Sequence, residues 1–472
     1  MGHRSGESRE QAALFPVLLD ELVGEAALVR VVDAWADSLD FKALGFGKAQ
    51  PQVMGAPPYD PADLLKLYVW GYLSAIRSSR ALERECHRNV ECMWLLRRLA
   101  PDHKTIAEFR RHNTEALVGA CAVFVQFARD QRLIAGKTVA IDGSKIRAVA
   151  SRKAVLSKTQ LQEQTRRNAE LIAQYMQVLD EQDHQEQGSS VRAPDVRRAL
   201  QKLQEQQQRA QSQLEQLQHK GKELMVQSEP QSQVMRQMGP GYNLQTAVET
   251  HSHLIVAHEV CTHASDQQQL QPMAEAASEA LGKAVVAVVD AGYANAEHMA
   301  QLDAQGIISY VPVHRAVNHQ ADGTLYEAKA FSYDVATDRM ICPAGQGLTR
   351  KQIHRKDKMV VYAAAVQDCQ DCSHKDQCTQ AERRFVTRHL YEEALQANAQ
   401  RMAQSPHMMQ LRRQTVEHPF ADLKHRILGN ARLLMRGLNG AKSELSIAVL
   451  AYNLKRVFNM KGATWMQQAL QG

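Results

Sequence analysis

The chain has 472 residues, of which 44% are hydrophobic, and its formal net charge is +6. This length allows two or three domains with cores of their own, and the composition excludes a chain that is disordered throughout. The charge is unevenly spread, because residues 401–472 hold eleven Lys and Arg against three Asp and Glu, whereas the other residues sum to −2. A basic C-terminal part predicts an anionic partner, most simply nucleic acid.

Two features of the sequence concern its compartment. No run of about 18 apolar residues occurs, and the opening MGHRSGESREQ lacks the apolar core of a secretory signal. We therefore expect a cytoplasmic protein with no membrane partner. Eight cysteines in such a chain are expected to be free, buried or metal-bound rather than paired in disulfides.

The first 135 residues are predicted to be helical, because apolar residues recur with helical period between turn-forming breaks. Arginines are frequent in these helices, namely Arg77, Arg80, Arg84, Arg88, Arg97, Arg98, Arg110 and Arg111. They can hold DNA phosphates. Acidic neighbours such as Glu83 and Glu85 weaken that interpretation, and a solvated charged face explains the arginines equally well.

Two apolar runs further along the chain each end in an aspartate. The run TVAI in 136-GKTVAIDGSKIRA-148 predicts a strand ending at Asp142, and 284-AVVAVVD-290 predicts another ending at Asp290. Neighbouring strands would place these side chains at one edge of a sheet, where a ligand has room to bind. For either aspartate alone, a capping or turn-forming role is the simpler explanation.

The segment between the two runs predicts further elements of a mixed α/β sheet. LQTAVETHSHLIVAHEV reads as a hairpin that turns near His251–His253, and 307–313 as a strand. Residues 266–281 are predicted to form a helix with Ser265 or Asp266 as its N-cap. Asp266 can also lie near the carboxylates, but capping accounts for it.

Residues 155–235 have a different composition. The stretch 201-QKLQEQQQRAQSQLEQLQ-218 contains nine glutamines, and apolar residues recur every seven positions at Leu203, Ala210, Leu217 and Leu224. This pattern favours a pair of long helices or a short coiled coil inserted into the fold. Disorder is the alternative, because the glutamine tract is polar on all sides.

Three charges in 413-RQTVEHPFADLKHRI-427 fall on one stripe of a regular helix. Arg413, Glu417 and Lys424 would lie within about 40° of one another. A charged surface face is the simple explanation. If Glu417 meets the two strand-end aspartates, however, three carboxylates can hold two Mg²⁺ ions, which stabilise the attacking and leaving oxygens of a phosphoryl transfer.

At this point the sequence resembles the DDE transposases of bacterial insertion sequences, whose catalytic core has an RNase-H-like fold. The resemblance covers most of the chain and depends on motifs that occur in the expected order. These are 59-YDPADLLKLYVWGYLSAIRSSRALERECHRN-89, 102-DHKTIAEFRRHN-113, IDGSKIRA, GPGYNLQTAVE, VVDAGYAN, EHPFADLKHRILG and RGLNGAKSELSIAVLAYNLKR.

The resemblance implies roles for particular residues. Asp142, Asp290 and Glu417 look like the three catalytic carboxylates. One branch of the family carries an Arg-x3-Glu-x6-Lys signature whose cations contact DNA phosphates near the cut end, and Arg413 and Lys424 have that spacing.

Two positions depart from that signature. Its tyrosine would fall at Gln410. Pro419 predicts that the helix kinks or begins near His418.

The resemblance also implies a reaction and its partners. Metal-activated water would hydrolyse a phosphodiester at each transposon end, and the freed 3′-hydroxyl would then attack target DNA. The implied cofactors are two Mg²⁺ or Mn²⁺ ions, held by Asp142, Asp290 and Glu417. The implied partners are double-stranded DNA, carrying the terminal inverted repeats or the target, and a second protomer in a homodimer on the DNA. The setting is the bacterial cytoplasm, at the nucleoid when DNA is bound.

A cysteine cluster lies in the region 315–387. Cys342 is followed by Cys369, Cys372 and Cys378 in 369-CQDCSHKDQC-378, and His374 lies among them. Four thiolates are sufficient for a tetrahedral structural zinc site, and the histidine can replace one of them. Reduced thiols without a metal remain the alternative, because the second pair lacks tight knuckle spacing.

We therefore predict an α/β protein with an RNase-H-like mixed sheet and flanking helices. An all-helical N-terminal domain precedes the sheet, and a helical or coiled-coil insertion and a Cys-rich insertion interrupt it. The predicted parts are 1–135 (N-terminal, DNA binding), 136–154 with 236–314 (catalytic core), 155–235 (Gln-rich insertion), 315–387 (Cys-rich insertion) and 388–472 (C-terminal helices that complete the core).

Three functions compete. The first is a DDE transposase. The second is a DNA-binding protein derived from a transposase that has lost catalysis, and intact Asp142, Asp290 and Glu417 speak against it. The third is an interaction protein organised by the glutamine-rich helices, which explains neither the strand-end aspartates nor the basic C-terminal part.

Overall fold

The computed structural model describes residues 18–50, 57–184, 193–219, 221–313 and 325–471. The opening segment, in which we found no secretory signal, lies outside the described residues. So do parts of the predicted regions 1–135, 155–235 and 315–387. Within the described ranges, no helix combines the length and the apolar character needed to cross a membrane.

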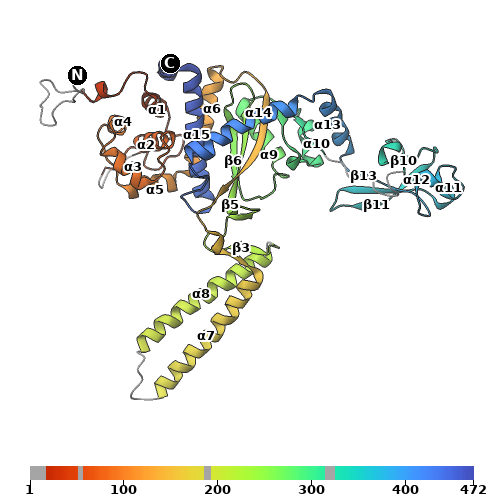
Figure 1. The fold of residues 1–472 in the computed structure, drawn as a ribbon, viewed down its shortest axis with the longest axis horizontal. Helices are drawn as coiled ribbons and strands as arrows, with labels where there is room; N and C mark the ends of the chain where they lie inside the picture. Colours follow the sequence, from red (N-terminus) through yellow and green to blue (C-terminus); the bar gives the residue numbers. More distant parts are fainter. Residues whose placement is uncertain (1–17, 51–56, 185–192, 220, 314–324, 472) are drawn as a thin grey trace, which may run out of the picture.

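A mixed sheet lies in the middle of the molecule (Figure 1). Its strands are β1 (Thr138–Arg147), β4 (Gln233–Met235), β5 (Gly239–Glu249), β6 (Ile255–Cys261), β7 (Val286–Val288) and β8 (Ile308–Tyr310). β1 pairs antiparallel with β5 on one side and parallel with β7 on the other, and β8 continues the parallel part. β5 also pairs antiparallel with β6 and, at its start, with β4. A strand lies at each predicted place, and the predicted hairpin is confirmed. The prediction that the first strand ends at Asp142 is wrong, because β1 stays paired with β5 as far as Arg147.

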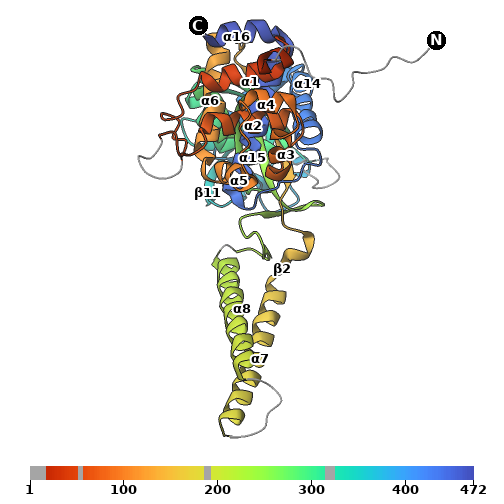
Figure 2. The same ribbon diagram turned by 90° about the vertical axis from the view of Figure 1, so that its left-hand side faces the viewer.

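Helices cover the sheet and extend to one side of it (Figures 1 and 2). The N-terminal helices are α1 (Leu28–Asp37), α2 (Pro61–Leu73), α3 (Ser79–Cys86), α4 (Val90–Leu95), α5 (His103–His112) and α6 (Thr114–Asp130). Those of the sheet region are α9 (Leu270–Leu281), α10 (Ala296–Ala304), α13 (Glu392–Gln404), α14 (Met408–Ala421), α15 (Gly437–Lys461) and α16 (Ala463–Gln471).

Helix α15 joins the N-terminal helices to the sheet. It packs against α2 and α6 on one side and against β6 on the other, and nearly every residue from Gly440 to Leu454 is buried. One continuous apolar core therefore runs from the N-terminal helices through α15 into the sheet. By itself the sequence 444-ELSIAVLAYNLKRVFNM-460 predicts an amphipathic helix. The helix is present, but its position between two layers requires apolar or small residues on all sides.

A glutamate is buried inside this joint. Glu444 of α15 has no exposed surface, and its carboxylate accepts hydrogen bonds from the backbone N–H groups of Leu434 and Met435. Its second oxygen lies 3.4 Å from Nη1 of Arg77, which comes from the N-terminal part. Burial raises the pKa of Glu444, and the charges of Arg110 and Arg77 oppose that shift.

Two further parts project from this body. The first is an arm of two antiparallel helices, α7 (Lys158–His184) and α8 (Ala193–His219), joined to the body through the strand pair β2 (Val155–Ser157) and β3 (Leu224–Val226) (Figures 1 and 2). The helices pack along each other around Leu161 and Leu217. The described part of the glutamine-rich segment is therefore helical rather than disordered.

The second projecting part, called the Cys-rich module below, lies at the end of the molecule away from the N-terminal helices (Figure 1). It is an antiparallel sheet in the order β13–β12–β11–β10–β9 with a small core of its own. Its elements are β9 (Ser332–Asp334), β10 (Arg339–Ile341), β11 (Gly347–His354), β12 (Met359–Ala363), α11 (Val366–Gln370), α12 (Lys375–Cys378) and β13 (Phe385–His389).

The buried carboxylate provides a test of the joint. Replacing Glu444 by Ala leaves Arg77, Arg110 and two backbone N–H groups without their anion, so we expect the free energy of unfolding to fall by about 3–5 kcal/mol. As a control, Glu259→Ala removes the exposed ion pair between Glu259 of β6 and Lys442 of α15. This change should cost at most about 1 kcal/mol. Urea unfolding measures both. Equal losses of unfolding free energy in the two variants would contradict the role of Glu444 as a buried anion that holds the joint together.

Candidate active site

The structure brings together Asp142 and Asp290, the two aspartates that follow the predicted apolar runs. Asp142 lies within β1, opposite Thr246 of β5. Asp290 follows β7 by two residues and caps the 3-10 turn Ala291–Tyr293, where its Oδ1 accepts the N–H of Gly292 at 2.8 Å. Because β1 and β7 are adjacent and parallel, the two carboxylates lie at the same edge of the sheet.

One guanidinium bridges these two carboxylates. Nη2 of Arg412, on α14, lies 2.9 Å from Oδ1 of Asp142 and 3.2 Å from Oδ2 of Asp290. The arginine is largely buried, with 12% of its side chain exposed, and Asp142 is 22% exposed. Burial raises the pKa of Asp142, whereas the charge of Arg412 lowers it and those of Asp290 and Asp266 raise it further. Two carboxylates that would repel each other are thus held around one positive charge.

The other residues of the predicted site are placed differently. Lys424 is half-buried and lies within electrostatic reach of Asp142: burial lowers the pKa of this lysine, and the aspartate opposes the shift. Arg413 and Glu417 are exposed and make no ion pair or hydrogen bond with any residue that the structure describes. Glu417 lies about 140° around the helix from Arg412. The structure thus joins Asp142 and Asp290 through Arg412 and brings Lys424 within electrostatic range of Asp142, and no described contact joins Glu417 to them.

The sequence analysis missed Arg412, and helix geometry explains why. The spacing of Arg413, Glu417 and Lys424 identified a stripe on α14 but could not show which stripe faces the sheet. The neighbouring arginine faces the aspartates. A charged residue one position before the stripe, on a helix that must cover two acidic strand ends, is the signal that could have identified it.

Pro419 lies inside α14, so the expectation that the helix begins near His418 is wrong. The helix runs from Met408 through Ala421 and then widens into a π-helical turn, Asp422–Ile427. Proline lacks the N–H that would bond to the carbonyl of Thr415. The imidazole of His253, in the β5–β6 turn, hydrogen-bonds to that backbone instead. The π turn changes the helical phase before Lys424, so the predicted stripe is not straight.

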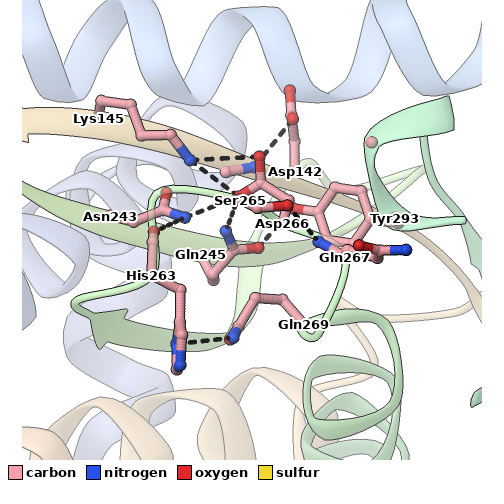
Figure 3. Close-up of polar contacts among 12 residues, drawn as sticks. Asp142, Lys145, Asn243, Gln245, His263, Ser265, Asp266, Gln267, Gln269 and Tyr293 are labelled. Carbon is pink, nitrogen blue, oxygen red and sulfur yellow. Dashed lines mark hydrogen bonds and ion pairs between the residues drawn. The ribbon is translucent and has the colours of Figure 1, made fainter. Parts of the chain in front are cut away.

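Asp266 is not the helix cap that we predicted. Helix α9 begins at Leu270 with Gln269 as its N-cap, so the assignment of Ser265 or Asp266 is wrong. The Asp266 carboxylate instead accepts hydrogen bonds from three side chains, shown in Figure 3. They are Lys145 (3.0 and 3.2 Å), Asn243 (2.7 Å) and Gln245 (2.6 Å). A local capping rule could not reveal these donors, because they come from two paired strands far away in sequence.

Gly143 connects this network to the aspartate pair. Its N–H donates to Oδ1 of Asp142 at 2.8 Å. On the other face of β1, a Cβ at Gly143 would lie 2.3 Å from Nε2 of Gln245 and 2.6 Å from Oδ1 of Asp266. The absent side chain leaves the space that the Asp266 carboxylate occupies. The buried hydroxyl of Tyr293, three residues after Asp290, donates to the amide oxygen of Gln245 and extends the network to the second aspartate loop.

The four cysteines of the Cys-rich module gather at one place. Cys342, Cys369, Cys372 and Cys378 all line a cavity of about 20 Å³. Burial raises the pKa of the Cys378 thiol, and the other three thiols raise it further. His374 lies aside from them, with its Nδ1 3.0 Å from the hydroxyl of Tyr326. Cys86, Cys92 and Cys121 are buried packing residues in the N-terminal helices.

Metal-binding geometry is not formed at either place. In the part of the chain that the structure describes, no group of three or more His, Cys, Asp or Glu is arranged to hold a metal ion. At the sheet edge, the guanidinium of Arg412 occupies the position between the two carboxylates. In the Cys-rich module, the cysteines share a cavity without forming a ligand cage.

The fold and the site define a class: a mixed α/β protein in which one aspartate within the central strand and one after the neighbouring parallel strand lie together, with a helix that carries Arg412 packed over them. Residues 17–112 match the family described as Transposase domain (DUF772), and residues 341–458 match the family described as Transposase DDE domain. No curated protein matches the chain significantly. Together the two matches support a DDE transposase of an insertion sequence.

The close packing at Gly143 can be tested. In Gly143→Ala the new methyl group meets Gln245 and Asp266, so we expect a loss of about 1–3 kcal/mol in the free energy of unfolding. The matched control is Gly24→Ala, because a Cβ at Gly24 has no atom within 4 Å, and it should change stability by less than about 0.5 kcal/mol. Thermal unfolding distinguishes them. A neutral Gly143→Ala would show that the network is looser than described.

Proposed function

We propose that this transposase cuts a phosphodiester bond at each end of its element and joins the freed 3′-hydroxyl to target DNA, with divalent metal ions as cofactors. The observation that carries the proposal is the pair of carboxylates, Asp142 and Asp290, drawn around one positive charge. An anionic pair at a sheet edge, beneath a basic helix, has the charge pattern needed to hold cations close to a phosphate.

We further propose that the central sheet is an RNase-H-like fold. Its support is a central β1 that carries the first aspartate, an antiparallel hairpin of β5 and β6 on one side, and the parallel strands β7 and β8 on the other. The predicted division into core, Gln-rich insertion, Cys-rich insertion and C-terminal helices goes with this proposal. Because the N-terminal helices and the sheet share one apolar core, we propose that they form a single structural unit.

The chemistry of the residues fits Mg²⁺ or Mn²⁺ at this edge. Carboxylate oxygens are the hard ligands that both ions prefer. Asp142 and Asp290 would hold the ions, and Glu417 is the third carboxylate that we propose to complete the set. Bound ions would activate water and stabilise the charge that develops on the phosphate. For this, the guanidinium of Arg412 must leave the position between the carboxylates.

The basic residues of α14 and of the following π turn would hold the DNA strand. Arg413 is exposed and unpaired among the described residues, and Lys424 lies beside Asp142, so both can meet a phosphate close to the metal ions. Once released, Arg412 can do the same, because guanidinium groups bind phosphate in a bidentate manner. Positioning of the strand is a main contribution of the protein in such displacements.

The arginines of the N-terminal helices fall into two groups. Arg97 pairs with Asp63, Arg88 with Glu85, and Arg110 is buried against Tyr72, so these three support the fold. The exposed ones without a close acidic partner in the described chain are Arg80, Arg98 and Arg111. We propose that this second group contacts DNA carrying the terminal inverted repeats. We also propose a homodimer on DNA, acting in the bacterial cytoplasm.

A nicking assay tests the function. Purified protein with Mg²⁺ or Mn²⁺ should nick DNA that carries the inverted repeats flanking its gene. Asp142→Asn and Asp290→Asn should each reduce nicking by at least about a hundredfold, because each removes a metal ligand. Glu417→Gln should do the same if it is the third ligand. Asp180→Asn, on the exposed surface of the arm, is the matched control and should nick like the unaltered chain.

DNA binding, measured without metal, separates the alternatives. All these variants should still bind the repeats. If the unaltered chain binds them but never nicks them, it is a DNA-binding derivative without catalysis. If it neither binds nor nicks, an interaction protein is the better explanation.

We also propose that the four cysteines of the Cys-rich module hold a structural zinc ion. Their convergence on one cavity supports this, and four thiolates are a common set of ligands for structural zinc. A bound ion would link Cys342, which follows β10, to the segment of α11 and α12 that carries the other three. This would stabilise a module whose own apolar core is small.

Metal analysis of the purified protein tests the zinc site. About one zinc per chain is expected, and Cys372→Ser should lose it and lower the unfolding temperature of the module, since ligand binding is coupled to folding. Cys261→Ser, at a half-buried cysteine of β6, is the control and should retain zinc. Protein purified without chelators that contains no zinc would leave the cysteines as free thiols.

A further inference from the structure

Three exposed cations and one half-buried arginine lie on the Cys-rich module, where the function proposed above assigns nothing. Lys351 is on β11, Arg355 and Lys356 are in the turn that follows it, and Arg383 precedes β13. We call these four residues, together with Phe385, the basic track. None of the four cations forms an ion pair within the described residues. In contrast, the neighbouring Arg350 pairs with Asp338. The nearest acids in the sequence are Asp357 and Glu382.

The turn that carries the inner end of the basic track is tied to helix α10. Lys358, in the same turn as Arg355 and Lys356, forms an ion pair with Glu297 at the start of α10. The hydroxyl of Tyr391 donates to the same carboxylate at 3.0 Å. Glu297 comes seven residues after Asp290, on the chain that leaves the catalytic turn. In Figure 1 the module accordingly continues outward from the α10 and α13 side of the sheet.

The outer end of the track combines an exposed aromatic ring with cations. Phe385 is 44% exposed, although a phenyl ring of this size is usually buried. Nζ of Lys351 and the guanidinium carbon of Arg383 each lie 5.3 Å from the centre of its ring. The ring thereby holds the two cations at one place on the surface, although one lies on β11 and the other precedes β13.

A hollow of about 320 Å³ adjoins Phe385, and its lining favours an anion. It contains Arg383 and Arg384 but no carboxylate. Arg384 is only 7% exposed, and its guanidinium donates to the backbone carbonyls of Cys378 at 2.7 Å and of Tyr326 at 2.8 Å. Its Nε has no partner in the described chain. A fixed, buried positive charge next to an open hollow is a receptor for a phosphate group.

We propose that the basic track is a second DNA-binding surface of this transposase, which holds the phosphate backbone of duplex DNA as it leaves the aspartate site. This rests on the proposed function. The five residues of β12, which lies between the two ends of the track, span roughly 17 Å, or about five base-pair steps of duplex DNA. The contacts would be with phosphates, so they would strengthen binding without reading the sequence.

Charge reversal tests the proposal. The double variant Lys351→Glu with Arg383→Glu is compared with Lys202→Glu with Arg209→Glu, which reverses two exposed cations of the arm. Fluorescence anisotropy of labelled duplexes without divalent metal gives the affinity at several salt concentrations. We expect the track variant to bind about tenfold more weakly, with a salt dependence reduced by about two units for two lost phosphate contacts. The loss of affinity should be the same for duplexes that carry the terminal inverted repeats and for duplexes of unrelated sequence. The arm variant should behave like the unaltered chain.

Hydroxyl-radical footprinting locates the effect. The track variant should lose protection over about five base pairs on one side of the cleavage site and keep it elsewhere. A milder variant, Lys351→Gln with Arg383→Gln, guards against misfolding and should show a smaller loss of the same kind. If the track variant keeps the affinity, salt dependence and footprint of the unaltered chain, the proposal is overturned. It is also overturned if the unaltered chain binds duplex RNA more tightly than duplex DNA and the track variant loses that binding. If the unaltered chain binds no DNA at all, the proposed function itself fails.

Discussion

The site depends on one electrostatic constraint: two carboxylates at the same sheet edge need a positive charge between them. Parallel pairing of β1 with β7 brings Asp142 and Asp290 together, and burial makes their mutual repulsion stronger than it would be in water. The guanidinium of Arg412 supplies the charge in this structure. A divalent ion can supply it more strongly, so the same constraint that places Arg412 explains why the edge would bind metal.

The residues around Asp142 and Asp290 help to hold the two aspartates in place. Gly143 allows Asp266 to approach the back of β1, and Asp266 in turn ties together side chains of β1 and β5. Tyr293 extends these bonds to the loop that carries Asp290. On the other side, α15 anchors the sheet to the N-terminal helices through a buried core and Glu444. The aspartates therefore lie on a rigid scaffold, whereas the basic residues that face them lie on helix α14 and its π turn.

Much of the fold could be predicted from the sequence, because apolar periodicity and strand-end residues are local signals. They located most strands of the sheet and the helices of the arm, and they pointed to Asp142 and Asp290, which the structure brings together. These local signals failed where contacts between residues far apart in the sequence determine the structure. Asp266 looks like a helix cap in its own neighbourhood, yet its partners come from β1 and β5. Arg412 and Arg413 are equivalent by composition, and only the packing of α14 on the sheet selects Arg412. Nothing in the local sequence shows that Glu444 is buried, because the residues that cover it come from the N-terminal helices.

Anomalous diffraction from crystals grown with Mn²⁺ tests the central claim most directly. The account predicts anomalous density between the carboxylates of Asp142 and Asp290, with the side chain of Arg412 displaced from both. With DNA present, two peaks about 3.5–4 Å apart are expected. Crystals in which Arg412 still bridges the two aspartates, while Mn²⁺ binds elsewhere or nowhere, would contradict it.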